Sequence, residues 1–122
     1  MSQGSYKIST NTTNKTVELY VKGRAKEADL LEFINEYNKT VNSIQPSQYD
    51  LIVDCLEMDL EKQEMIDKLS AVFIMYKETG FKNIIFKVKK ANLQKQLSEV
   101  ARMSGFGEAR FHGIWFQIDK QG

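Results

Sequence analysis

The chain has 122 residues, of which 27% are charged and 42% hydrophobic, and its net charge is +1. This length and composition are typical of one soluble globular domain, which we expect to span residues 1–122 with flexible ends at 1–4 and 120–122. The near-neutral charge excludes a general attraction to nucleic acid or anionic membranes, and no apolar run reaches the ~20 residues of a membrane span.

The cellular compartment is indicated by the cysteine content and by the N-terminus. The single cysteine, Cys55, cannot form an intrachain disulfide, which favours a reducing compartment. The opening residues, MSQGSYKIST, lack the apolar core of a signal peptide. We therefore expect a cytoplasmic protein that is not inserted into a membrane.

The N-terminal third alternates between apolar and polar residues and then changes to a helical period. Alternation over about residues 5–10 and 16–22, with short polar side chains between, predicts a β-hairpin. After Gly23, apolar residues recur every three or four positions from about 25 to 42, which predicts one buried face of a helix. The residues of that expected face are Ala28, Leu31, Ile34, Tyr37 and Val41, with Leu30 beside them.

The central segment begins with an apolar run, Leu51-Ile52-Val53, which is typical of a central strand covered on both sides. We expect this strand to end near Asp54 and Cys55. An acidic loop should follow, and then a helix over about 62–79 that ends at Gly80. The carboxylates of the expected loop are Glu57, Asp59 and Glu61.

The C-terminal part contains one more strand and one more helix. Residues 84–88 are predominantly apolar and predict a buried strand, and Asn92 is suited to cap a helix that ends at Gly105. The apolar residues of 114–118 predict a terminal strand. The expected order is ββαβαβα plus this C-terminal strand, an α/β fold with a mixed sheet and helices packed on it.

Residues that carry chemistry are few. Cys55 and His112 are the only thiol and imidazole, and an unpaired cysteine after a buried strand is more often an inert core residue than a nucleophile. The chain has no cluster of cysteine and histidine for zinc, no oxygen-ligand motif and no phosphate-binding glycine motif. The lysines around residues 82–95 favour a solvated rim over a nucleic-acid patch. We expect no catalytic residues, metal or cofactor.

The order of elements, the strand LIVD ending at Asp54 and the helix closing at Gly80 resemble the STAS domain, the SpoIIAA-like fold of bacterial anti-sigma-factor antagonists. The segments TVELYVKGRAKEADLLEFINEYNKTV and FKNIIFKVKKANLQKQLSEVARMSGF look like further parts of that domain. The resemblance covers about residues 5–106. It implies a bacterial, non-enzymatic, regulatory module that binds another protein, such as a kinase-like or sigma-regulatory protein.

Antagonists of this family carry a phosphorylated serine or threonine at the start of the second helix. Aligned on Asp54 and Gly80, the acceptor position falls on Gln63, and the nearest hydroxyl, Ser70, lies about two helical turns further on. The resemblance therefore implies a protein-binding surface without a phosphorylation switch. The residues expected to form this surface are Glu57, Asp59, Glu61, Lys62, Gln63 and Glu64.

Two alternatives stay open. The protein could carry a small apolar ligand or lipid, in a pocket drawn from the apolar residues of the helices, although such residues are more often core. It could also self-associate as a structural protein or homodimer through the apolar segment around Trp115. The pocket residues in question are Phe73, Met75, Tyr76, Met103 and Phe106.

Overall fold

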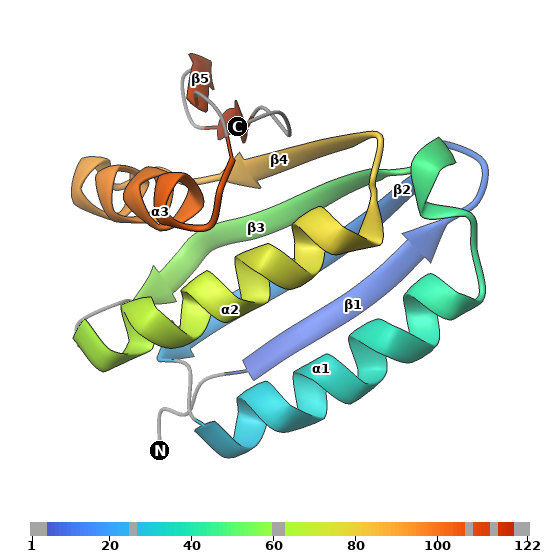
Figure 1. The fold of residues 1–122 in the computed structure, drawn as a ribbon, viewed down its shortest axis with the longest axis horizontal. Helices are drawn as coiled ribbons and strands as arrows, with labels where there is room; N and C mark the ends of the chain where they lie inside the picture. The colour runs from blue at the N-terminus through green and yellow to red at the C-terminus, as the bar shows by residue number, and fades with distance from the viewer. Residues whose placement is uncertain (1–4, 25–26, 60–62, 107–108, 113–114, 119–122) are drawn as a thin grey trace.

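The computed structural model describes residues 5–24, 27–59, 63–106, 109–112 and 115–118. Over these residues the chain forms one six-stranded sheet with three α-helices on one side of it (Figure 1). This confirms the predicted α/β class and the order ββαβαβα. The strands are β1 (Ser5–Asn11), β2 (Thr16–Arg24), β3 (Asp50–Asp59), β4 (Asn83–Lys87), β5 (Ala109–His112) and β6 (Trp115–Ile118). The helices are α1 (Glu27–Asn42), α2 (Gln63–Thr79) and α3 (Ala91–Met103), and a short 3₁₀ helix spans Pro46–Gln48.

The strands lie in the order β1-β2-β3-β4-β6-β5. The central three, β2, β3 and β4, are parallel, and β1 and β6 pair antiparallel on either side of them. The predicted hairpin is present, and its turn is held by the Asn11 side chain, whose Oδ1 accepts the backbone N–H groups of Thr13 and Asn14. The predicted terminal strand is β6. The structure adds β5, an antiparallel strand before it that the sequence analysis missed.

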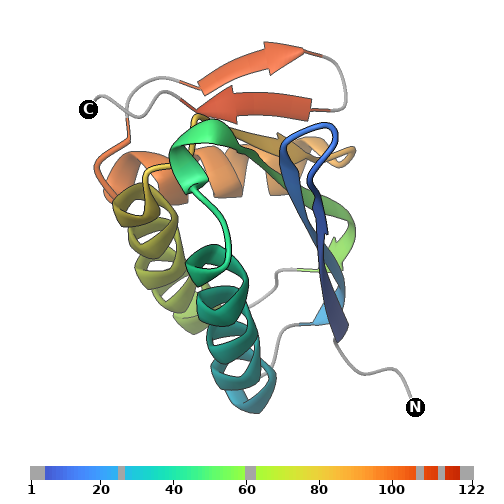
Figure 2. The same cartoon turned by 90° about the vertical axis from the view of Figure 1, so that its right-hand side faces the viewer.

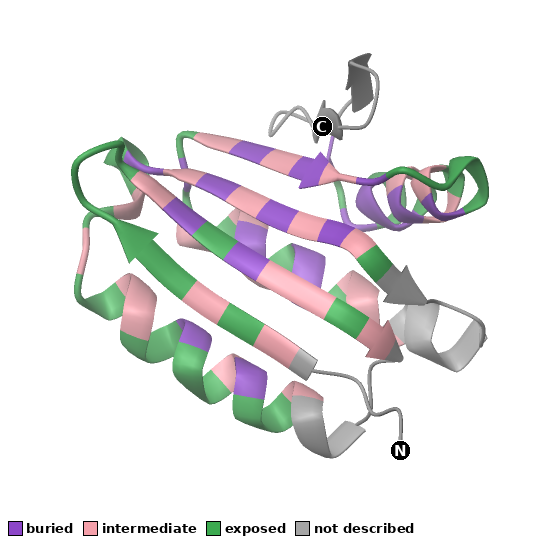
Figure 3. Cartoon of the chain, turned by 180° about the vertical axis from the view of Figure 1, so that it is seen from behind, coloured by how far each residue is buried: buried purple, intermediate pink, exposed green. Residues whose placement is uncertain are grey.

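The helices all pack on one face of the sheet, and the opposite face carries none of the described elements (Figures 2 and 3). Alternate residues of each central strand are therefore buried against the helices. In β3, Leu51, Val53 and Cys55 are buried, whereas Ile52 and Asp54 face the other way and are partly exposed. The prediction that this strand is covered on both sides is wrong for the described chain, because both crossover helices lie on the same face.

The buried face of α1 differs from the predicted one by a rotation about the helix axis. Phe33 is buried and lies edge-on to Tyr6 with ring centroids 5.5 Å apart, whereas Leu31 is 64% exposed. Positions three and four apart lie above one another on a helix, and Phe33 and Tyr37 satisfy this spacing together. Among the described side chains, the face that contacts the core therefore consists of Leu30, Phe33, Ile34, Tyr37 and Val41, and the predicted Ala28 lies outside them.

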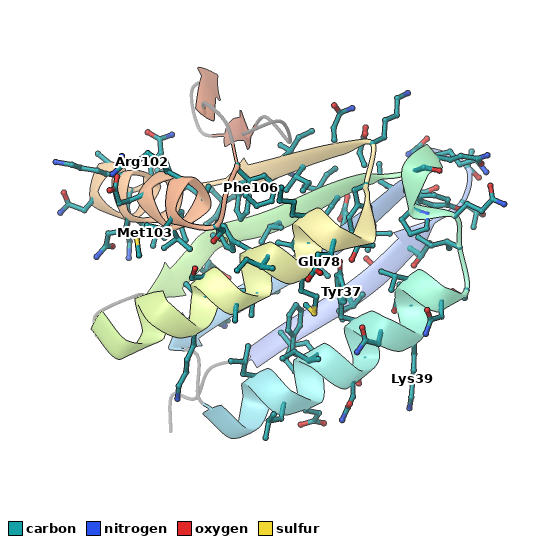
Figure 4. All side chains as sticks on the ribbon, viewed as in Figure 1. Tyr37, Lys39, Glu78, Arg102, Met103 and Phe106 are labelled. Atoms are coloured by element: carbon teal, nitrogen blue, oxygen red, sulfur yellow. The ribbon has the colours of Figure 1, made fainter. Side chains whose placement is uncertain are left out.

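The α1–α2 contact contains an ordered pair of hydroxyls. The Thr79 hydroxyl donates its one proton to the Met75 carbonyl at 2.8 Å, so at 2.6 Å it must accept the proton of the Tyr37 hydroxyl. The Tyr37 side chain points from α1 toward α2 (Figure 4). Its ring also lies 5.6 Å from that of Tyr76, centroid to centroid, within the aromatic core.

The helix ends carry the glycines predicted for them. Gly80 follows α2 with φ +83°, and Gly105 follows α3 with φ +89°, a conformation that costs other residues a steric clash at Cβ. The predicted N-cap of α3 is wrong, because the helix begins two residues earlier, with Lys90 as cap and Asn92 inside the first turn. Lys90 forms no side-chain cap, so the start of α3 is not marked by the usual polar residue.

Candidate functional site

A β-bulge interrupts the pairing of β2 with β3. Tyr20 of β2 pairs with Asp54 of β3, but the next pair is formed by Lys22 and Glu57. One residue of β2 therefore lies opposite two residues of β3, at positions 55–56. Bulges are less common in parallel pairs than in antiparallel ones, and they occur often beside functional sites, where they redirect side chains.

The bulge places the Glu57 side chain on the open face of the sheet. Side chains alternate along a strand, so one extra residue reverses the faces of all that follow. Glu57 consequently shares a face with Tyr20, whose hydroxyl donates a hydrogen bond to its carboxylate. The sequence analysis placed Glu57 and Asp59 in a loop. This was wrong, because β2 continues to Arg24 and keeps β3 paired as far as Asp59.

The side chain of Asp54 supplies a hydrogen-bond acceptor for the backbone inside the bulge. Its Oδ1 accepts the backbone N–H of Leu56 at 3.1 Å. A backbone N–H that a bulge removes from the strand ladder needs another partner, because leaving it unpaired costs free energy. Asp54 is therefore a structural residue of this region as well as a partly exposed polar group.

The backbone register aligns one residue of each of the six strands in a row that passes through Tyr20 and Asp54. Each residue in the row pairs with the residue on the neighbouring strand, in the order β1, β2, β3, β4, β6 and β5. The row brings together residues that are far apart in the sequence. Its members are Lys7, Tyr20, Asp54, Lys87, Trp115 and His112.

Two depressions lie side by side on the open face and share Tyr20 and Asp54. The first has a volume of about 360 Å³ and extends over β1 to β4. The second has a volume of about 510 Å³ and lies over the bulge. The first is lined by Lys7, Ser9, Glu18, Leu19, Tyr20, Ile52, Asp54 and Lys87, and the second by Tyr20, Asp54, Leu56, Glu57 and Lys89. We call this region, with both linings, the bulge face.

The bulge face carries charges of both signs, and the acidic and basic groups differ in their hydrogen bonding within the chain. Asp54 and Glu57 each accept a hydrogen bond from this chain. In contrast, the ammonium groups of Lys7, Lys87 and Lys89 form no ion pair or hydrogen bond among the side chains that the structure describes. Among the described side chains of the bulge face, these lysines are therefore the charged groups that remain available to donate to an external molecule.

Cys55 and His112 are not brought together. Cys55 lies in β3 on the helix-covered face, and burial, with a smaller contribution from the Asp54 charge, raises the pKa of its thiol to about 12. His112 lies in β5, three strands away in the sheet order, which corresponds to about 14 Å. A buried, protonated thiol is a poor nucleophile, so the geometry supports the interpretation of Cys55 as a core residue.

The acidic residues do not form a metal site in the part of the chain that is described. Among those residues, no group of three or more His, Cys, Asp and Glu side chains is close enough to hold a metal ion.

The remaining residues of the predicted surface lie at the start of α2. The helix begins at Gln63, directly followed by Glu64, which agrees with the predicted start of the second helix. Glu61 and Lys62 lie outside the described residues, as do the expected flexible ends at 1–4 and 120–122. Ser70 packs between helices, where its hydroxyl lies 3.1 Å from that of Ser104.

The aromatic residues considered for an apolar pocket are part of the core. Phe73 and Tyr76 are buried, and the Phe73 ring stacks on Phe86 with centroids 4.9 Å apart. Phe106 is also buried, with the Lys77 ammonium 5.9 Å from its ring centroid, whereas Met103 is exposed (Figure 4). Phe73, Tyr76 and Phe106 thus belong to the core cluster, and Met75 is partly buried against it.

No helix in the described residues is both long enough and apolar enough to cross a membrane. This finding agrees with the absence of long apolar runs in the sequence.

The chain has a SpoIIAA-like fold. Its structure is similar to the crystal structure of an uncharacterized protein of the DUF3478 family with a SpoIIAA-like fold, from Shewanella loihica PV-4, with a TM-score of 0.56. The sequences are 17% identical, and the match covers 84% of this chain and 83% of that one. No protein family matches the sequence, and no curated protein is significantly similar to it. The fold expected from the resemblance is thereby confirmed.

Proposed function

We propose that this chain is a non-enzymatic protein-binding module with a regulatory role, and that the bulge face is its contact surface. The observation that carries the proposal is the uncovered face of β2, β3 and β4. Parallel strands are usually covered on both faces, whereas here the described helices all lie on one side. A partner protein would supply the missing layer.

The composition of the bulge face favours a protein over a small ligand. Small-molecule sites are mostly apolar and carry few polar groups. The residues that line both depressions are mainly charged or hydroxyl-bearing and come from several strands, although most of the surface exposed in the second depression is apolar. Mixed charges around a half-buried aromatic residue, Tyr20, are typical of a protein interface, where the charges select the partner and the aromatic group supplies contact area.

The proposal extends to the start of α2. Asp59 and the residues at 61–64 follow Glu57 in the chain, and we include them in the contact surface. Gln63 is the first residue of α2 and has no hydroxyl that a kinase could phosphorylate. Regulation of binding would therefore depend on the partner, for which a kinase-like or sigma-regulatory protein in a bacterium is our candidate, by likeness of fold alone.

Site-specific photocrosslinking in the source organism tests this function. A benzophenone amino acid is introduced at Lys7, on the bulge face, and separately at Lys39, which is exposed on α1 (Figure 4). We expect a discrete crosslinked protein from the variant at position 7 and none from the variant at position 39. Equal crosslinking from both positions, or none from position 7, would overturn the proposal.

A further inference from the structure

We infer that the bulge face binds an extended segment of the partner with the pattern acid-x-base-x-acid, where x is any residue. This inference rests on the proposed function and deepens it by naming the chemistry of the partner. Its basis is the part of the row on β1 to β4, which consists of Lys7, Tyr20, Asp54 and Lys87 and has a cation at each end and a carboxylate between them.

The spacing of the row sets the spacing of the partner's charges. Neighbouring strands are about 4.8 Å apart, so Lys7 on β1 and Lys87 on β4 are separated by about 14 Å. An extended peptide rises about 3.4 Å per residue, and every second side chain points the same way. Three successive side chains on one side of such a peptide therefore span about 14 Å, which matches the distance between the two lysines.

The available hydrogen-bonding groups decide the charge at each position. The ammonium groups of Lys7 and Lys87 have no described partner and would bind carboxylates at the two ends of the segment. The middle residue would lie between Tyr20 and Asp54. A lysine or arginine there meets the Asp54 carboxylate, of which one oxygen is held by Leu56, and the face of the Tyr20 ring.

A general polyanion fits this surface less well. Glu18, Asp54 and Glu57 lie among the lysines and would repel a continuous run of phosphates or carboxylates. The alternation of signs favours a partner with the complementary alternation.

Peptide titrations with the full chain test the inference. The probe is a capped peptide containing Glu-Thr-Lys-Thr-Glu, and binding is followed by amide chemical shifts in ¹⁵N-labelled protein. The controls are the charge-reversed Lys-Thr-Glu-Thr-Lys, the same-composition Glu-Glu-Lys-Thr-Thr and a single-stranded DNA oligonucleotide. We expect the probe to bind at least about fivefold more tightly than each control, because two exposed ion pairs contribute factors of this size.

Charge reversal in the protein supplies the reciprocal test. Lys7→Glu/Lys87→Glu should lose the probe and gain the peptide Lys-Thr-Lys-Thr-Lys, because the two ends of the row are reversed while Asp54 still meets the middle residue. The matched variant Lys39→Glu/Lys95→Glu, with two exposed lysines on α1 and α3, should keep the original preference. Lys87 is partly buried, so Lys87→Glu could prevent folding, and in that case Lys7→Gln/Lys87→Gln replaces the double glutamate variant. This variant should bind the probe more weakly and should show no increased affinity for Lys-Thr-Lys-Thr-Lys.

Three results would overturn the inference: no preference for the probe, tighter binding of the oligonucleotide, or a change of oligomeric state on reversing Lys7 and Lys87. The last would assign the face to a second copy of the chain. A partner crosslinked at position 7 together with a failed peptide test would leave the protein-binding function standing and reject only the pattern. Absence of a crosslinked partner would reject the function itself.

Discussion

The carboxylate of Asp54 accepts the backbone N–H of Leu56, 3.1 Å away, inside the bulge of β3. This contact connects a side chain on the open face with the backbone irregularity that sets the orientation of the following residues. Because the bulge reverses the alternation of side chains, the position of Glu57 beside Tyr20 depends on it. Asp54 is thus expected to stabilise both the strand and the surface that follows it.

Replacement of Asp54 tests this role. Asp54→Ala leaves the Leu56 N–H without its acceptor, and we expect a loss of about 1–2 kcal/mol in the free energy of unfolding, measured by urea denaturation. Asp54→Asn keeps an oxygen in place and should recover most of this loss. Amide shifts at residues 56–57 should change in the alanine variant and return toward wild type in the asparagine variant. Equal stability of the two variants would argue against the hydrogen bond as the cause.

Stability is expected to fall at alkaline pH because buried acids, among them Tyr37, Cys55 and Tyr76, hold their protons. Burial raises the pKa of Tyr37 to about 12, and burial also raises the pKa of Cys55 to about 12. In the unfolded chain these groups ionise at their usual values of 10.0 and 9.0. Above those values the folded state binds more protons than the unfolded state, so the free energy of unfolding decreases as pH rises.

The measurement is urea denaturation at several pH values between about pH 8 and about pH 11. The variant Cys55→Ala lowers stability at every pH by removing buried atoms, but its decline above the usual thiol pKa should be shallower than that of the wild type. Parallel curves for the two proteins would show that the thiol does not contribute. Lysines deprotonate in the same range in both proteins, so the difference between the curves isolates the thiol.

The sequence predicted the fold well because the fold depends on local patterns. The hairpin, the three helices and the glycines at 80 and 105 follow from hydrophobic period and backbone preference, and they are present close to the predicted bounds. β5 was missed because Ala109–His112 is a short segment without a continuous apolar pattern. Its strand conformation comes with its pairing to β6, which the local sequence does not indicate. The one-sided sheet also could not be derived, since period alone does not say which face a crossover helix covers.

The candidate site was predicted only in part, because it depends on register. Glu57 was predicted to lie on the contact surface, but the apolar run LIVD gives no sign of the bulge at positions 55–56 that directly follows it. Lys7 and Lys87 lie in one row with Asp54 through pairings between distant segments, and no spacing in the sequence encodes those pairings. A signal was available in hindsight: the alternation of Leu56 and Met58 with Glu57 and Asp59 is the pattern of a continuing strand.

The revised face of α1 makes a direct prediction about stability. Phe33→Ala removes a buried ring that contacts Tyr6 and should cost about 3–5 kcal/mol in the free energy of unfolding. Leu31→Ala, at a position that is 64% exposed, should change the free energy of unfolding by no more than about 0.5 kcal/mol. Thermal or urea denaturation of the two variants decides between the faces. A larger loss for the Leu31 variant would restore the face first expected from the sequence.

The two helix-terminal glycines should respond differently to alanine because their surroundings differ. Both have positive φ, so either substitution costs about 1–2 kcal/mol from backbone strain. A Cβ at Gly80 would meet nothing within 4 Å, whereas one at Gly105 would lie 2.9 Å from the Lys77 ammonium. That ammonium donates a hydrogen bond to the Gly105 carbonyl at 2.6 Å and joins α2 to the end of α3. Gly105→Ala must displace it and should therefore cost about 0.5–1.5 kcal/mol more than Gly80→Ala.

A double-mutant cycle separates the two effects at Gly105. In a Lys77→Met background the ammonium and its hydrogen bond are absent, so Gly105→Ala should cost only the backbone strain, as Gly80→Ala does in the wild type. The free energies of unfolding of the four proteins give the coupling between positions 77 and 105. A coupling near zero would mean that the Lys77 side chain moves aside without loss. A clear coupling would show that this contact stabilises the packing of α3 on α2.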